Sequence, residues 1–352
     1  MATLDKSIIT PSAASTIVDE AFQTTNDMLP LSNVFPLESN NGETTVHWTP
    51  NLPVTQTEKM NYRAWDGEAG YGKTTESSIE KYGGLLPLSK KAHISERDII
   101  THKSDMSWMR TDIENHLKRM GMEAAVTAEL LRIPAIVDAK FTIKENGVNA
   151  EYDFERPAAL NNLTPAKKWT VADATPEKDI EGWIAAMEAA NGGLPSAVIT
   201  TRAVIQALRT NKSVITDYTN QSKTNAPESI KAVEVLEWLR IHGLTDVRLI
   251  DEMYTQVERE NGFKLPVNVS TLIPDATFIM FSSFNDLNLG ATYMGPTVEA
   301  ATPEYEINRS DNSGMVGYVM YDNAPTRYDV WTNGSLMPIL QQAVSTLKAN
   351  VL

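Results

Sequence analysis

The sequence predicts a mixed α+β fold that is built in several parts. Residues 104–133 repeat apolar side chains at helical spacing over about eight turns, which is long for a globular helix. From residue 175 the pattern changes to alternating short helices and strands, and long strand-like runs follow toward the end of the chain. A chain of 352 residues with 42% hydrophobic and 22% charged residues can bury the core that such a fold needs.

The N-terminal quarter, residues 1–92, differs from the rest of the chain. Prolines interrupt it, and one short helix is expected near residues 15–26. Asn41 and Gly42 predict a tight turn that joins VFPLES and ETTVHW as a hairpin, because such turns need positive φ angles. A long polar loop rich in Gly and Tyr follows. These segments hold too few apolar residues for a core of their own, so we expect them to lie on a neighbouring subunit.

The longest helix is expected over residues 104–133. A capping-box-like pair, Ser95 and Asp98, opens a short helical segment before it. The apolar stripe that defines the long helix consists of Met106, Met109, Ile113, Leu117, Met120, Ala124, Thr127 and Leu131. Pro134 is expected to end the helix, because proline lacks the backbone N–H that the next turn needs.

The remainder of the chain predicts a second hairpin, a compact domain and long strands. Asn146 and Gly147 lie between AKFTIK and VNAEYDFE and predict the tight turn of this hairpin, and residues 155–175 are expected to be irregular. A helix that begins at Thr175 and the helices TRAVIQALRTN and PESIKAVEVLEWLRIHG alternate with the strands SAVIT, VRLID and TFIMFSS. The stretches TYMGPTVEAATPEYEIN and GYVMYDNAPTRYDVWT predict long strands.

The composition excludes several classes of partner and site. Lys and Arg total 31 against 45 Asp and Glu, and the resulting formal charge of -14 does not attract nucleic acid or an anionic membrane. The absence of cysteine excludes disulfides, thiolate metal sites and Cys nucleophiles. The sequence has no stretch near 18 consecutive apolar residues and no features of a signal peptide, so neither a membrane span nor a leader is expected.

Motifs for catalysis and for metal or cofactor binding are not found in the sequence. No two of the five histidines are spaced i, i+4 on one helix, and there is no H-E-x-x-H, G-x-S-x-G or P-loop string. Asn333, Gly334 and Ser335 come nearest to a nucleophile elbow, and we interpret them as a turn. The best candidates for an acid/base pair are carboxylates that we interpret as a solvated acidic face: Asp251, Glu252, Glu258 and Glu260. We therefore assign no catalytic, cofactor-binding or metal-binding residue.

Two aromatic residues on the polar loop, Trp65 and Tyr71, point to a binding role instead. Exposed aromatic side chains on a loop without a core more often anchor a partner than decorate a surface. The residues alone therefore describe a protein in several parts that is not obviously an enzyme and whose N-terminal region is expected to contact a neighbour.

The order of the expected elements resembles that of tailed-bacteriophage major capsid proteins with the Hong Kong 97-type fold, in the branch related to the lambda capsid protein E. The exit from the long helix, LLRIPAIVDAKFTIKENGVNAEYDFERP, and the segment GLPSAVITTRAVIQALRTNKSV are similar to that family. So are ENGFKLPVNVSTLIPDATFIMFSS, LGATYMGPTVEA and DVWTNGSLMPILQQAV, so the resemblance covers essentially the whole chain. One departure is Ala139, where the family often has Gly before the first hairpin strand.

The resemblance implies a division of the chain into four parts. These are an N-terminal arm (1–38), an extended loop over an adjacent subunit (39–92), a peripheral domain (93–175 and 290–332, with the spine helix at 104–133) and an axial domain (176–289 and 333–352). It also implies contacts between subunits by residues of the extended loop, which here are Trp65, Tyr71, Lys73 and Tyr82. The hairpin tip formed by Glu145, Asn146 and Gly147 would lie near a symmetry axis.

The function implied by the resemblance is that of a major capsid protein without enzymatic activity. Such a protein self-assembles into hexamers and pentamers of an icosahedral shell that encloses double-stranded DNA, which it meets only by non-specific proximity. It is assembled in the bacterial cytoplasm and remains in the virion. A portal and a separate scaffolding protein are the expected partners, since the chain has no room for a scaffolding segment, and a decoration protein stays open. We predict no cross-link from Lys59, Lys73 or Lys81.

Two other classes of function stay open as alternatives. The first is another phage-encoded or secreted β-rich assembly or binding protein, such as a tail component. The second is an acidic hydrolase that uses a carboxylate pair, for which the residue to test is Asp251.

Overall fold

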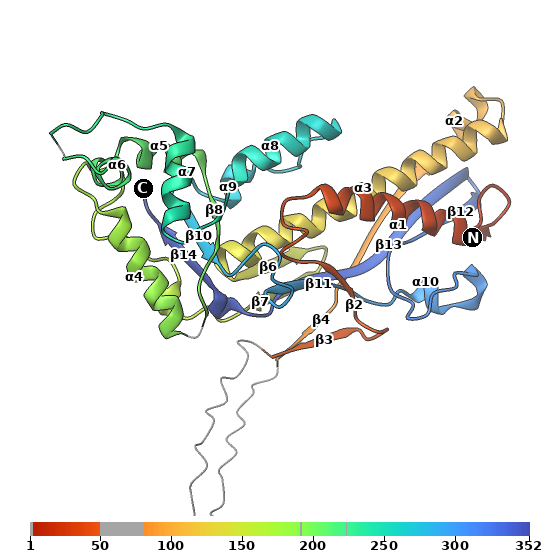
Figure 1. Cartoon of the computed structure of the whole chain (residues 1–352). Coiled ribbons are helices and arrows are strands. Elements are labelled where there is room, and N and C mark those ends of the chain that lie inside the picture. The colour runs from red at the N-terminus through yellow and green to blue at the C-terminus, as the bar shows by residue number, and fades with distance from the viewer. Residues whose placement is uncertain (1–2, 50–80, 191, 223) are drawn as a thin grey trace, which may run out of the picture.

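The computed structural model describes residues 3–49, 81–190, 192–222 and 224–352. Its helices are α1 (Pro11–Met28), α2 (Glu96–Thr101), α3 (Met106–Asp138), α4 (Pro176–Ala189), α5 (Arg202–Thr210), α6 (Lys212–Thr219), α7 (Ala232–Ile241), α8 (Ile250–Asn261), α9 (Val269–Leu272) and α10 (Val298–Ala301). Its strands are β1 (Thr3–Asp5), β2 (Leu37–Ser39), β3 (Thr45–Trp48), β4 (Lys81–Gly84), β5 (Pro87–Ile94), β6 (Lys140–Glu145), β7 (Val148–Asp153), β8 (Ala197–Thr200), β9 (Asp246–Leu249), β10 (Thr277–Phe281), β11 (Gly290–Met294), β12 (Val316–Asn323), β13 (Thr326–Leu340) and β14 (Thr346–Asn350). This mixture confirms the predicted α+β class (Figure 1).

Two sheets lie toward opposite ends of the molecule (Figure 1). The large sheet has the order β1-β12-β13-β11-β2, and β5 also pairs with β13. Helices α1 and α3 pack on each other and on this sheet, since their apolar stripes share one core cluster with its strands. The small sheet has the order β14-β10-β8-β9, and α4, α5, α6 and α7 gather around it.

Strand β13 connects the two ends. It pairs with β12 from Thr326 to Asn333 and with β5 from Tyr328 to Ser335. Its last five residues, 336–340, pair with β11. A short 3-10 turn then leads directly into β14 of the small sheet.

The interpretation of Asn333, Gly334 and Ser335 as a turn is wrong, because all three lie inside β13. The glycine is needed here for packing and not for a change of direction. A Cβ atom at Gly334 would lie 2.3 Å from the Sδ atom of Met315, which packs against the strand at this point.

The N-terminal segment packs within its own chain. The helix near residues 15–26 is confirmed as α1, and its side chains Ala14, Val18 and Phe22 are completely buried against α3. The two helices approach closely at Gly121, where a Cβ atom would lie 2.5 Å from the carbonyl oxygen of Val18. For the described part of the first 92 residues, the prediction of a segment without its own core is therefore wrong. Its physical reason is that the stripe of α1 is completed by α3, about 100 residues later.

The predicted hairpin between VFPLES and ETTVHW is also wrong. The turn exists, with φ angles of 52° at Asn41 and 80° at Gly42. Its two flanking strands do not pair with each other, because β2 joins β11 in parallel and β3 joins β4. The Asn40 backbone N–H donates to the carbonyl oxygen of Met294 at 2.9 Å, which holds β2 beside β11. Local turn chemistry thus set the reversal of the chain but not the partner of each strand.

Helix α3 is the long helix predicted from the apolar stripe, but Pro134 does not end it. The helix continues to Asp138 and ends at Ala139, which adopts the left-handed conformation with a φ of 52°. The last turn persists because its apolar side chains are buried and because Arg156 bonds its free carbonyl groups. Arg156 donates to the carbonyl oxygens of Ile136 at 2.6 Å and Val137 at 2.9 Å.

The second half of the chain largely follows the predicted alternation. The second hairpin and the strands SAVIT, VRLID and TFIMFSS are present as β6–β7, β8, β9 and β10. Helix α7 begins at Ala232 and not near Pro227. The segment before it is not helical, because the backbone N–H of Ile230 donates to the carbonyl oxygen of Arg209 and not to a carbonyl of its own turn. Residues 298–301 form α10 and residues 303–305 form a 3-10 turn where a strand was predicted, and Thr297 caps α10. Helix α8, which starts directly after β9, was not predicted.

Candidate assembly surfaces

The two-stranded ladder of β3 and β4 flanks residues 50–80, which belong to the predicted extended loop, and is called the loop root below. The pairing runs from Thr45 opposite Gly84 to Trp48 opposite Lys81. Val46 and Trp48 face the core, whereas the Tyr82 side chain is 76% exposed. The ladder thus holds Trp48 and Lys81 side by side. Among the predicted contact residues the structure places Tyr82 on this outer face; the other three, Trp65, Tyr71 and Lys73, lie outside the described residues.

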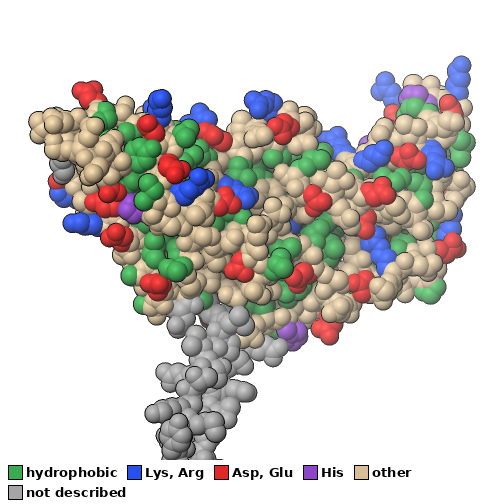
Figure 2. All heavy atoms as spheres, viewed as in Figure 1, with side chains coloured by type: hydrophobic (Ala, Val, Ile, Leu, Met, Phe, Trp, Pro, Cys, Tyr) green, Lys and Arg blue, Asp and Glu red, His purple; other side chains and the backbone are tan. Residues whose placement is uncertain are grey.

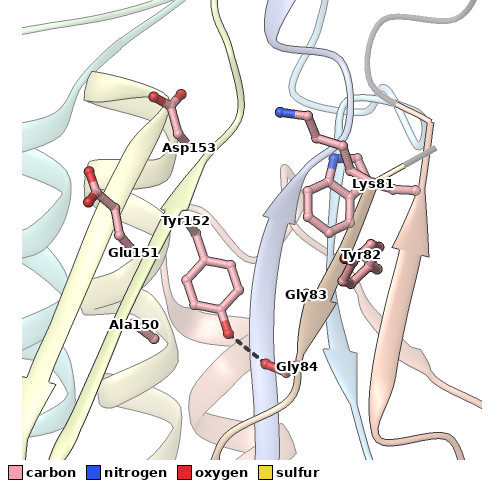
Figure 3. Close-up of a pocket in the computed structure, with 9 residues that line it drawn as sticks. Lys81, Tyr82, Gly83, Gly84, Ala150, Glu151, Tyr152 and Asp153 are labelled. Carbon is pink, nitrogen blue, oxygen red and sulfur yellow. Dashed lines mark hydrogen bonds between the residues drawn. The ribbon is translucent and has the colours of Figure 1, made fainter. Parts of the chain in front are cut away.

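A groove of about 460 Å³ separates β4 from β7 (Figure 3). The Tyr152 side chain points from β7 across it, and its hydroxyl donates to the carbonyl oxygen of Gly84 at 2.6 Å. Burial raises the pKa of the Tyr152 hydroxyl, so it stays protonated and able to donate. A Cβ atom at Gly83 would lie 2.9 Å from the Tyr152 ring, so β4 needs glycine at this point. Lys81 adds an ion pair with Glu155 beyond the end of β7.

The hairpin β6–β7 is confirmed with the register that the sequence predicts. Glu145 lies opposite Val148, and Asn146 and Gly147 form the two-residue turn with φ angles of 46° and 87°. The tip is exposed, and a Cβ atom at Gly147 would meet nothing within 4 Å. The other end is anchored in the core, where the rings of Phe141 and Tyr152 stack at 5.2 Å. The hairpin therefore presents a polar tip from a rigid base.

Large exposed apolar side chains are scattered over the described surface, and Val298 at 77% and Tyr82 at 76% are the most exposed. Figure 2 shows acidic and basic side chains interspersed between apolar ones over one face of the molecule. On a mixed surface of this kind, binding of a partner depends on many small complementary contacts and not on one strong electrostatic field.

The carboxylates weighed for acid/base chemistry are engaged in structural contacts around α8. Asp251 accepts the backbone N–H of Arg202 at 3.2 Å, and Glu252 forms an ion pair with the Arg202 guanidinium at 2.6 Å. Glu258 accepts the backbone N–H of Leu265, and Glu260 accepts the side-chain amide of Gln256. Within the described ranges, no group of three His, Asp or Glu side chains could hold a metal ion. None of the helices described there is both long and apolar enough to span a membrane.

The sequence was also compared with protein families and with curated proteins. Residues 90–308 match the family model described as phage major capsid protein E. The chain belongs to this family. No curated protein matches. The matched region runs from β5 through α3 and three strands of the small sheet, β8, β9 and β10, to the segment after α10.

Solved structures share the fold of this capsid protein at low sequence identity. The putative capsid protein of a prophage of E. coli CFT073 has a TM-score of 0.56 at 15% identity and covers 100% of both chains. A phage-related protein from Bordetella bronchiseptica RB50 has a TM-score of 0.51 at 14% identity, covering 94% of this chain and 96% of its own. The capsid of a native GTA particle has a TM-score of 0.50 at 11% identity, with coverage of 92% and 89%. The Hong Kong 97-type fold is thereby confirmed.

The sequence did not predict the contact between the loop root and the hairpin. Tyr152 and Gly84 are 68 positions apart, and neither belongs to a recognisable motif. The adjacent glycines at 83 and 84 are the one available signal, and they fall in the predicted long polar loop. In the structure Gly83 lets β4 approach the Tyr152 ring, whereas a Cβ atom at Gly84 would meet nothing within 4 Å.

Proposed function

We propose that this major capsid protein, a shell-forming subunit of a phage virion, assembles as hexamers and pentamers into an icosahedral shell around double-stranded DNA. The observation that carries the proposal is the family match over residues 90–308, joined to a fold shared with a prophage capsid protein along its entire length. Rings of five and six subunits are the closed, heterologous assemblies that such a shell requires.

We further propose the division of the subunit that the resemblance implies: an arm at 1–38, an extended loop at 39–92, a peripheral domain at 93–175 and 290–332, and an axial domain at 176–289 and 333–352. Two apolar clusters support it, since α1, α3 and the large sheet share one and the small sheet with α4 to α7 shares another. A third cluster packs the other face of the small sheet against α3 and the end of β13, so the two domains share an apolar interface. The pairing of β5 with β13 favours an end of the loop near Pro87.

The subunit contacts are proposed at the two features built above. Trp65, Tyr71, Lys73 and Tyr82 would contact the adjacent subunit, and the exposure of Tyr82 at the loop root supports this. Glu145, Asn146 and Gly147 would lie near a symmetry axis, which the exposed, rigidly anchored tip of β6–β7 supports.

The proposed partners beyond other copies are a portal and a separate scaffolding protein during assembly in the bacterial cytoplasm. The formal charge of -14 supports a wall that does not bind the packaged genome tightly, because like charges repel. We propose no enzymatic role for the chain, and the structural contacts of Asp251 and Glu252 support this view.

Electron microscopy of the expressed full chain in negative stain tests the proposal. Closed polyhedral particles are expected, whereas tubes or small discrete oligomers would indicate a tail-type assembly protein. A second variant replaces residues 55–80 by a short Gly-Ser linker and leaves the β3–β4 ladder intact. Free subunits or isolated rings are expected from it. Normal shells from this variant would contradict the role given to the loop.

A further inference from the structure

A cluster of buried polar side chains lies in the second half of α3, apart from the loop root and the hairpin tip. Glu129 and Arg132 are completely buried one turn apart, and Arg132 Nη1 donates to Glu129 Oε2 at 3.3 Å. The hydroxyl of Tyr254 on α8, itself buried, donates to Glu129 Oε1 at 2.7 Å. Arg132 Nε donates to the hydroxyl of Thr292 on β11 at 2.9 Å. We refer to these four residues as the Glu129 cluster.

The cluster also holds the segment that connects α1 to β2. The backbone N–H of Leu31 donates to Glu129 Oε1 at 2.9 Å. The hydroxyl of Thr292 donates to the carbonyl oxygen of Phe35 at 3.1 Å. Four parts of the chain that are far apart in sequence therefore meet at one carboxylate and one guanidinium.

Net stability does not explain why charges occupy this position. Removing two charges from water is costly, and a buried ion pair seldom gains more than apolar side chains of similar size would. Burial lowers the pKa of Arg132 and raises the pKa of Tyr254 well above its usual value. Among the described residues, Arg132 Nη2 has no acceptor. The advantage of this cluster over an apolar contact is that its hydrogen bonds have direction.

The orientation of helix α8 depends on these directional hydrogen bonds more than the orientation of the elements around it does. Only Ile250 and Tyr254 of its twelve residues are buried. Figure 1 shows α8 projecting from the small sheet with its C-terminal end away from the other helices around that sheet. Two buried side chains one turn apart, with Val257 half-buried against the cluster of α1 and α3, constrain the rotation and tilt of α8 less than a directional bond does.

We infer that the Glu129 cluster fixes the orientation of α8 and of the α1–β2 segment on α3. The bond from Tyr254 to Glu129 is the contact of this cluster that would have to open for α8 to change its orientation. The bond between Arg132 and Thr292 does not involve α8 and would remain. These contacts lie within one subunit, and their role is separate from the proposed assembly of the shell.

Hydrogen exchange of the full chain, measured by mass spectrometry on one oligomeric state, tests this inference. Tyr254→Phe removes one hydroxyl and keeps the ring. Exchange at residues 251–261 is expected to rise by about tenfold, since a hydrogen bond to a charged group is lost, while the middle of α3 is unchanged. The control is Tyr218→Phe on α6, whose half-buried ring packs in the core of the small sheet. Equal exchange of α8 in both variants would overturn the inference.

A double variant, Glu129→Leu with Arg132→Met, removes both charges of the cluster. Its melting temperature is expected to fall, because the Leu31 N–H and the Tyr254 hydroxyl stay buried without their acceptor, and this cost opposes the gain from removing a desolvated ion pair. Residues 29–36 and 251–261 are expected to exchange faster than in the wild type. Wild-type protection of both segments would show that the charges orient nothing. If this variant does not fold, Tyr254→Phe still decides the question, because that change removes a single oxygen atom.

Discussion

The hydroxyl of Tyr152 donates a hydrogen bond to the carbonyl oxygen of Gly84, and this bond ties the hairpin β6–β7 to the root of the extended loop. The loop root and the hairpin β6–β7, which are both proposed as subunit contacts, are therefore directly linked. A change at either one is expected to reach the other through this bond and through the ion pair of Lys81 with Glu155.

Tyr152→Phe is expected to lower the free energy of unfolding by about 1 kcal/mol, since one hydrogen bond to a backbone carbonyl is lost. Denaturant titration of the dissociated subunit measures it. Tyr82→Phe serves as the control on the facing strand, where the exposed hydroxyl is expected to matter by less than about 0.5 kcal/mol. Equal effects of the two changes would show that the bond across the groove contributes nothing.

Two glycines in helices are expected to respond in opposite ways to alanine. Gly121→Ala should destabilise the fold by about 1–3 kcal/mol, because the new methyl group meets the carbonyl oxygen of Val18 and forces α1 away from α3. Gly182→Ala in α4 meets no atom within 4 Å and should stabilise the fold by about 0.5–1 kcal/mol through helix propensity. Thermal unfolding of both variants checks the signs. Stabilisation by both would refute the close contact of α1 with α3.

Arg156→Met is expected to be among the most destabilising single changes in the chain, at about 3–5 kcal/mol. It leaves the carbonyl oxygens of Ile136 and Val137 buried without donors after Pro134 has already removed one bond from the helix. Burial lowers the pKa of Arg156 to about 10, so the guanidinium is still charged at neutral pH. Arg110→Met, which removes an exposed pair with Glu114, should cost less than about 0.5 kcal/mol in the same chemical denaturation.

Asp217 is expected to make stability depend on pH in the acid range. Partial burial raises the pKa of Asp217, but hydrogen bonds from Trp238 and His242 together lower it by more. The pKa in the folded state is therefore below the ordinary value. A lowered pKa gives stability that is complete above the unfolded value of about 4 and is lost as the pH falls through the folded value. Asp217→Asn should therefore be less stable than wild type at neutral pH, with a difference that narrows below about pH 4. A difference that is constant across this range would contradict the assignment.

The elements with strong local signals could be predicted from the sequence. The stripe that includes Met109, Ile113 and Leu117 predicted α3, and all three side chains are buried as expected. The turn at Asn146 and Gly147 predicted the hairpin with its register, because a two-residue turn fixes which residues lie opposite each other.

Features set by distant partners could not be predicted in this way. The apolar face of α1 gave no sign of its match to α3, and β2 gave no sign of its place beside β11. The local rule for Pro134 failed because Arg156, 22 positions later, supports the last turn of the helix. Of the candidate site, the exposed hairpin tip followed from its turn, whereas the bond between Tyr152 and Gly84 depends on two segments that share no local pattern.

The unbroken course of β13 has a consequence for how the subunit deforms. One strand of 15 residues spans the large sheet and, after a single 3-10 turn, becomes an edge of the small one. The spacing of the two ends is then set by this strand and by the short connection to β14, and an extended strand resists stretching. Tension applied at one end of the subunit is thus carried to the other along the backbone of β13. In a shell under internal pressure, this strand would bear the load in place of flexible loops.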